Sequence, residues 1–228
     1  MIINHAHRFV FVDVPKNAGT SVTEYLGALT TYRDLVLDAR PDAGRVERRF
    51  RERFGLGIHA TAARIREVMG ASDFAAYRII AVQRDPYERV RSLHAFLHEW
   101  TPWRDRPWSR AHLEEWESLH EINDFVRSRF FATEGPGRVF ERQTRWLCSP
   151  ADGEMLVDIR LRLETLEADL RALPERLGLP ADALDGSVPH LNATVPSSAV
   201  PLDAASRSII RERYREDFER LGDGIGGE

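Results

Sequence analysis

Residues 8–22 read RFVFVDVPKNAGTSV, and this stretch decides the fold that we expect for the rest of the chain. Its first part, residues 9–14, is a nearly continuous run of β-branched and aromatic residues, interrupted only by Asp13, as in a strand that is buried on both faces of a parallel sheet. Pro15 ends this run. Residues 22–29 then place apolar side chains at helical spacing. The stretch therefore predicts a strand, a loop and a helix.

The loop between the predicted strand and helix is a candidate anion site. The first N–H groups of a helix have no partner within it, and the helix end carries partial positive charge. Gly19 permits close approach of the backbone, Lys16 adds a full charge, and the hydroxyls of Thr20 and Ser21 can donate or cap the helix. A hydrogen bond to a charged group contributes about 1.5–3 kcal/mol, so Lys16 and the hydroxyls should decide the affinity for a phosphate. The alternative is an ordinary turn with a solvated lysine.

Lysine occurs only once in this chain. Of the 32 lysine and arginine side chains, all except Lys16 are arginines. With so strong a bias toward arginine among the basic residues, a lysine is expected to remain only where a compact, mobile charge is hard to replace by a planar guanidinium. We therefore predict that Lys16 is functional.

Length and composition limit the classes of protein. With 228 residues, of which 43% are hydrophobic, we expect a single domain over residues 1–228. The net charge of −4 argues against a general nucleic-acid or membrane-surface binder, whose affinity rests on a basic field. The single cysteine, Cys148, excludes an internal disulfide, and we find neither a membrane span nor a signal peptide. We expect a cytoplasmic protein, and the sequence does not indicate its oligomeric state.

A second strand–turn–helix pattern follows at residues 78–92. Residues 78–83 predict another buried strand, after which Asp85 can cap a helix that has Pro86 at its first position. Arg84 thus leaves the carboxyl end of a strand, where open α/β sheets bind ligands. Ser92 lies about two helical turns further on. The alternative is that Arg84 only pairs with a neighbouring carboxylate.

The other elements alternate between helix and strand. Helices are predicted over residues 46–54, from the segment 57–61 to Gly70, over 164–177 with a break near Pro174, and from Asp203 to Gly222. A strand with one solvent-exposed face is predicted over 156–163. This alternation predicts an α/β fold of three layers, P-loop-like, with a mainly parallel central sheet flanked by helices. The exposed arginines of 45–53 form either a solvated face or part of a site for an anionic acceptor.

The two loop motifs together resemble the signature of sulfotransferases that use 3′-phosphoadenosine 5′-phosphosulfate (PAPS), in particular the small, soluble bacterial members of the carbohydrate-type branch. Residues 143–147, 162–164, 177–180 and 189–194 match later landmarks of that family in order. The resemblance implies that the first motif holds the 5′-phosphosulfate and that the second holds the 3′-phosphate. The residues implied are Pro15, Lys16, Asn17, Ala18, Gly19, Thr20 and Ser21 for the first, and Arg84 and Ser92 for the second.

His59 is the candidate general base. It lies at the edge of a loop, where a histidine titrates near neutrality, although in isolation such a residue is more often an ordinary surface histidine. The resemblance assigns it the role of accepting the proton of the acceptor hydroxyl. The expected reaction is in-line transfer of a sulfuryl group, with Lys16 neutralising charge on the leaving phosphate. No metal is required by this scheme.

Two other functions stay open at this point. A nucleotide-dependent phosphotransferase is disfavoured because its loop places lysine directly after the last glycine, whereas Lys16 precedes Gly19. A non-catalytic module that senses a 3′-phosphorylated nucleotide would need Lys16 and Arg84 but not His59. The aromatic rings of the Trp-rich segment 100–116 either stack on the acceptor, a small molecule or a carbohydrate, or only bury their own loop; a pocket for the acceptor would be built from this segment and the loop around His190.

Overall fold

The structure is a computed structural model that describes residues 1–39, 44–99, 115, 118–132, 138–184, 186 and 200–222. Its contacts group into two compact units. Unit 1 comprises Met1–Arg84 and Gln143–Asn192, and unit 2 comprises Asp85–Arg142 and Ala193–Glu228. The single domain expected from the sequence stays a prediction, and each unit is described by itself.

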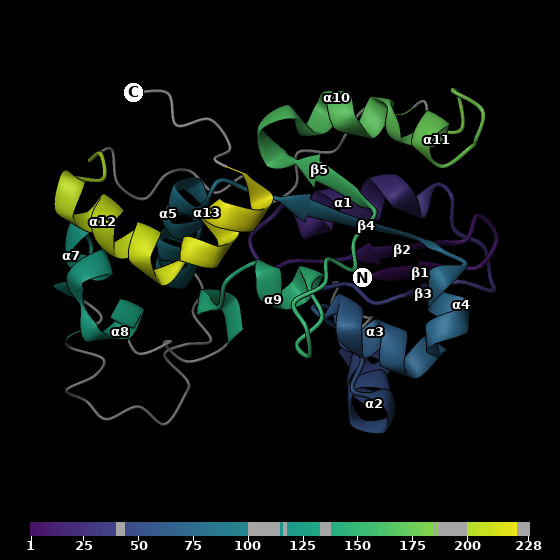
Figure 1. Cartoon of the computed structure of the whole chain (residues 1–228), viewed down its shortest axis with the longest axis horizontal. Helices are drawn as coiled ribbons and strands as arrows, with labels where there is room; N and C mark the ends of the chain where they lie inside the picture. Colours follow the sequence, from purple (N-terminus) through teal and green to yellow (C-terminus); the bar gives the residue numbers. More distant parts are fainter. Residues whose placement is uncertain are drawn as a thin grey trace. The chain divides into compact units, whose positions relative to one another are not determined.

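Unit 1 is built on a five-stranded sheet of order β3-β1-β2-β4-β5 (Figure 1). The strands are β1 (Ile2–Asn4), β2 (Phe9–Val12), β3 (Leu35–Val36), β4 (Arg78–Gln83) and β5 (Ile159–Arg162). β4 runs parallel to both β2 and β5, with Val12 opposite Ala81 and Gln83 opposite Arg162. The predicted α/β fold, with helices flanking a sheet that is parallel in its core, is confirmed.

The remaining strands are antiparallel and were not predicted. β1 pairs with β2 and with β3, so the sheet begins with a hairpin that places Ile3 opposite Val10. All four residues of β2 are buried, as the run of apolar residues indicated. The predicted strand over 156–163 is shorter in the structure, since only β5 joins the sheet.

One face of the sheet packs against three helices of unit 1. These are α1 (Gly19–Gly27), α10 (Leu166–Arg171) and α11 (Leu173–Arg176). Leu26 of α1 and Leu170 of α10 belong to the same buried cluster as Phe11, Ile80 and Leu161 of the sheet. Each such side chain contributes about 1.5–3 kcal/mol through burial, so this layer fixes where α1 begins relative to the strand ends.

The other helices of unit 1 include the two that the sequence predicts over residues 46–54 and from the segment 57–61 to Gly70. They are α2 (Gly44–Phe54), α3 (Ala62–Met69), α4 (Ala71–Ala75), α9 (Thr144–Leu147) and the 3₁₀ turn η3 (Leu163–Thr165). The Thr61 hydroxyl caps α3 by accepting from the N–H of Arg64 at 3.1 Å. Gly70, with φ of 86°, ends α3. The helix predicted over 164–177 has the predicted break, which lies at Ala172, between α10 and α11.

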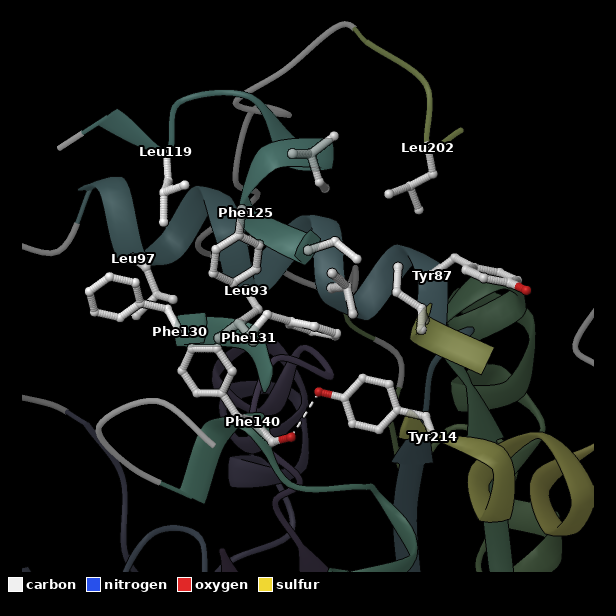
Figure 2. Close-up of a cluster of buried hydrophobic side chains, with 14 of the residues drawn as sticks. Tyr87, Leu93, Leu97, Leu119, Phe125, Phe130, Phe131, Phe140, Leu202 and Tyr214 are labelled. Carbon is white, nitrogen blue, oxygen red and sulfur yellow. Dashed lines mark hydrogen bonds between the residues drawn. The ribbon is translucent and has the colours of Figure 1, made fainter. Parts of the chain in front are cut away.

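Unit 2 consists of helices around an aromatic core (Figure 2). Its elements are α5 (Pro86–Glu99), α7 (Ile122–Arg127), α8 (Arg129–Ala132), η2 (Arg138–Phe140), α12 (Ala204–Arg213) and α13 (Arg215–Leu221). The carboxylate of Asp203 caps α12, as predicted, but Tyr214 divides the expected final helix in two. The buried Tyr214 hydroxyl donates to the carbonyl oxygen of Phe140 at 2.8 Å, which satisfies its polar atom within the core. None of the helices in the described part of the chain is long and apolar enough to cross a membrane.

Candidate active site

The turn after β2 has an unusual backbone. Lys16 and Ala18 both have positive φ, 70° and 58°, which non-glycine residues seldom adopt outside functional or strained positions. The N–H of Asn17 closes the turn by donating to the carbonyl oxygen of Val14 at 3.2 Å. A left-handed residue followed by right-handed ones turns successive N–H groups to the same side, and such a concave turn binds anions.

The same turn sets the start of α1. The helix begins at Gly19 with Ala18 as its N-cap, and no side chain caps it. The prediction that Thr20 or Ser21 caps the helix is wrong, because the left-handed Ala18 starts the helix early enough to place both hydroxyls inside its first turn. Thr20 is exposed there and Ser21 is buried. The first turn of α1 therefore combines an uncapped end with two hydroxyls, a favourable arrangement for a phosphate.

Gly19 is required for a reason that the sequence did not indicate. A Cβ atom at this position would lie 1.8 Å from Oδ1 of Asp13, so no larger residue fits without displacing that carboxylate. Asp13 follows β2 directly and is only 5% exposed. The glycine thus makes room for a buried carboxylate beneath the turn.

The turn after β4 meets the turn after β2 within unit 1. Nη1 of Arg84 donates to the carbonyl oxygen of Lys16 at 3.1 Å. Nδ2 of Asn17 donates to the carbonyl oxygen of Val82 at 2.7 Å. The structure therefore brings together the two turns that the sequence singled out.

Gln143 connects both turns and was not recognised as a site residue from the sequence. Its Oε1 accepts from Nδ2 of Asn17 at 2.7 Å and from the N–H of Arg84 at 3.0 Å, and its Nε2 donates to the carbonyl oxygen of Arg84 at 2.8 Å. The side chain is completely buried. A buried amide that uses both of its ends in this way holds two backbone segments in a fixed relation. Its place in the matched landmark 143–147 was the only signal for it in the sequence.

His59 is held against the end of β2. Its Nδ1 lies 3.0 Å from the carbonyl oxygen of Asp13 and 3.5 Å from that residue's Oδ2. A carbonyl oxygen can only accept, so Nδ1 carries the proton and Nε2 carries the lone pair of the neutral ring. The side chain of His59 is 45% exposed, whereas that of Asp13 is 7% exposed. This pairing orients an accessible nitrogen base, and Asp13 is a second residue that sequence reasoning missed.

Two buried side chains hold the loop that carries His59. Nε1 of Trp146, a residue of α9, donates to the carbonyl oxygen of His59 at 3.1 Å. Oε1 of Glu47, from α2, accepts from the N–H of Ile58 at 3.4 Å and from Nε of Arg51 at 3.0 Å. Because Gln143 is the N-cap of α9 and Trp146 lies within this short helix, α9 supports the Lys16 turn, the Arg84 turn and His59 together.

Ser92 lies on α5, in unit 2, and is 7% exposed. Its sharing of one ligand with Arg84 stays a prediction. The Trp residues at 100, 103, 108 and 116, and the loop around His190, lie outside the described residues. Among the described residues, no group of three or more His, Cys, Asp or Glu side chains is placed to hold a metal ion.

A comparison with models of protein families identifies the family to which this chain belongs. A model of the sulfotransferase family matches residues 1–222, which is nearly the whole chain. The chain therefore belongs to the sulfotransferase family, as the resemblance of its two motifs indicated. No curated protein and no solved structure is significantly similar to it.

Proposed function

We propose that this protein transfers a sulfuryl group from PAPS to an acceptor hydroxyl. The observation that carries the proposal is the contact of Arg84 with the backbone of the Lys16 turn, because it joins the two nucleotide-binding motifs of the family in one place. The uncapped first turn of α1 and the charge of Lys16 fit a phosphate or phosphosulfate group. PAPS would supply the activated sulfuryl group.

The roles follow from the position of each residue. Residues 15–21 would hold the 5′-phosphosulfate, with the ammonium of Lys16 stabilising charge at the bridging oxygen. Arg84, together with Ser92, would hold the 3′-phosphate. His59 would accept the proton of the acceptor hydroxyl at Nε2, since Asp13 fixes the proton on Nδ1. Pre-positioned charge and proton transfer are then the main sources of catalysis.

The proposal also covers the chemical class of the acceptor, the type of fold and the cellular compartment. The resemblance to the carbohydrate-type branch favours a hydroxyl of a carbohydrate or of a small molecule that carries one. The strand–loop–helix unit at Lys16 supports a P-loop-like description of the fold. The cytoplasm remains the expected compartment.

Calorimetric titration tests the choice of nucleotide. Adenosine 3′,5′-bisphosphate, the desulfated product, and ATP are titrated into the protein at matched ionic strength. Because Arg84 and Lys16 present two anchoring points, we expect tighter binding of the bisphosphate. A preference for ATP would contradict the assignment of PAPS and would favour a phosphotransferase.

His59→Ala separates an enzyme from a nucleotide-sensing module. The variant should lose about 10²–10⁴-fold in kcat, the usual contribution of a general base, while its affinity for the bisphosphate stays unchanged. Transfer of labelled sulfate to a panel of hydroxyl acceptors measures the first quantity, and calorimetry measures the second. His5→Ala is the control, because His5 is an exposed histidine of unit 1 that contacts Tyr77. Wild-type binding without any transfer would favour the sensing module.

A further inference from the structure

Arg162 is a partly buried cation, and within the part of the chain that the structure describes the hydrogen-bonding requirements of its guanidinium are not met. Its Nε and Nη2 atoms are buried, and neither has a hydrogen-bond partner among the described residues. The backbone N–H of Arg162 is satisfied, since it donates to Oδ2 of Asp169 at 2.7 Å. The unmet requirement therefore belongs to the guanidinium alone.

Arg89, in unit 2, shows how the same chain satisfies a buried guanidinium. This residue is 2% exposed, and its Nη1 and Nη2 donate to the carbonyl oxygens of Glu141 and Val139 at 2.9 and 3.0 Å. Burial of a charge without such partners is strongly unfavourable, and an unsatisfied buried group in a native protein calls for a missing partner. An anion would satisfy the buried N–H groups of the Arg162 guanidinium.

The position of Arg162 indicates where that anion would lie. Arg162 is the last residue of β5 and pairs in register with Gln83, the last residue of β4. Arg84 follows immediately and contacts the Lys16 turn beyond β2. Neighbouring strands are about 4.8 Å apart, so three basic residues stand at the carboxyl ends of three successive parallel strands. Ligands of open α/β sheets bind outside these ends.

We infer that Arg162 binds a phosphate group of the donor nucleotide, an inference that rests on the proposed function. A guanidinium suits this task because its planar array of N–H groups matches the oxygens of a phosphate. The nucleotide then supplies the partner that Nε and Nη2 lack among the residues that the structure describes. No role for Arg162 follows from the two loop motifs, which contain only Lys16 and Arg84 as charged nucleotide ligands.

The test compares Arg162→Met with Arg160→Met. Methionine keeps the length and apolar character of the stem but removes the charge, and Arg160 is an exposed arginine of the same strand. By calorimetry, Arg162→Met should bind adenosine 3′,5′-bisphosphate about 10- to 100-fold more weakly than wild type, as expected for the loss of charge-assisted hydrogen bonds. Arg160→Met should stay within about twofold, because exposed charges contribute little.

A second measurement separates binding from structural support. Since the unpartnered guanidinium is unfavourable in the free protein, Arg162→Met should unfold at the same temperature as wild type or at a higher one when no ligand is present. The bisphosphate should then raise the unfolding temperature of wild type more than that of the variant. Arg162→Lys, which keeps the charge without the planar fork, gives a second variant and should bind less tightly than wild type.

Titrations with adenosine 3′-monophosphate and with adenosine 5′-monophosphate identify which phosphate of the bisphosphate Arg162 binds. Loss of affinity for adenosine 3′-monophosphate but not for the 5′-monophosphate assigns Arg162 to the 3′-phosphate, and the converse assigns it to the 5′ side. Equal binding of the bisphosphate by wild type and Arg162→Met would overturn the inference and leave the proposed function intact. A wild type that does not bind the bisphosphate would instead contradict the proposed function. In that case protection by inorganic phosphate, present in wild type and absent in Arg162→Met, still tests the anion site.

Discussion

Two turns of this protein have the same pattern of strand, loop and helix but treat the start of the helix differently. After β2, the loop has two left-handed residues, and no side chain caps α1. After β4, neither loop residue has a positive φ, and Oδ1 of Asp85 accepts from the N–H groups of Tyr87 and Glu88 at 2.8 and 3.0 Å. A helix end that has its own carboxylate does not need an external anion. The comparison therefore supports the proposal that the anion binds at the start of α1 and that the second turn contributes Arg84.

Among the substitutions that test the difference between the two turns, Lys16→Met should have the largest effect on activity, because it removes the charge from the uncapped turn. Loss of one pre-positioned group that stabilises developing charge lowers kcat by about 10²–10³-fold. Steady-state kinetics with saturating PAPS and acceptor measures the change. Arg33→Met, at an exposed arginine of unit 1, is the control and should leave kcat unchanged. A Lys16→Met enzyme with wild-type kcat would show that the β2 turn is only a structural connection.

Gln143→Ala should uncouple the two turns. Removal of the buried amide leaves the N–H and the carbonyl oxygen of Arg84 without their partner, which should lower the free energy of unfolding by about 1–3 kcal/mol. Urea denaturation measures this loss, and Arg142→Ala provides a neighbouring control in which only an exposed ion pair with Glu216 is removed. That control should change stability by about 0–1 kcal/mol. Equal effects of the two substitutions would argue against a coupling role for Gln143.

The sequence predicted the local parts of this site and missed the long-range ones. The strand before Lys16 and the end of α3 at Gly70 depend on neighbouring residues, so short-range patterns were sufficient. Asp13 and His59 are 46 residues apart, and Asn17 and Gln143 are 126 apart. No periodicity or turn preference connects such pairs, because their contact depends on the order of strands in the sheet.

The cap of α1 shows a different limit. Thr20 and Ser21 are good capping residues, and propensity favoured them at the N-cap. The chain instead places Ala18 there in a left-handed conformation, which propensity disfavours. The packing of α1 on the sheet and the buried carboxylate of Asp13 below Gly19 override the local preference. The sequence therefore identified the loop but not its geometry.

The helix that follows the second turn should make the protein sensitive to acid. Burial lowers the pKa of His94, on α5, from 6.5 to about 4; the carbonyl of Leu119 and the charge of Glu121 oppose this shift, whereas His98 and His120 reinforce it. The unfolded chain then binds a proton that the folded chain does not, so stability is complete above pH 6.5 and falls as the pH approaches 4. The loss at pH 5 is about 2 kcal/mol. Urea denaturation at pH 7 and pH 5 measures it, and His94→Gln should show a smaller loss.

Asp85→Ala should have the smallest effect on the free energy of unfolding, and it tests the capped start of α5 after β4. Loss of the cap leaves the N–H groups of Tyr87 and Glu88 to water and should lower the free energy of unfolding by about 1 kcal/mol. Asp85→Asn keeps an oxygen that can accept from the same groups, so its stability should stay close to that of wild type. Urea denaturation of the three proteins measures both effects. If Asp85→Ala were as stable as wild type, the carboxylate would not be needed to satisfy α5, and the physical distinction between the two helix ends would disappear.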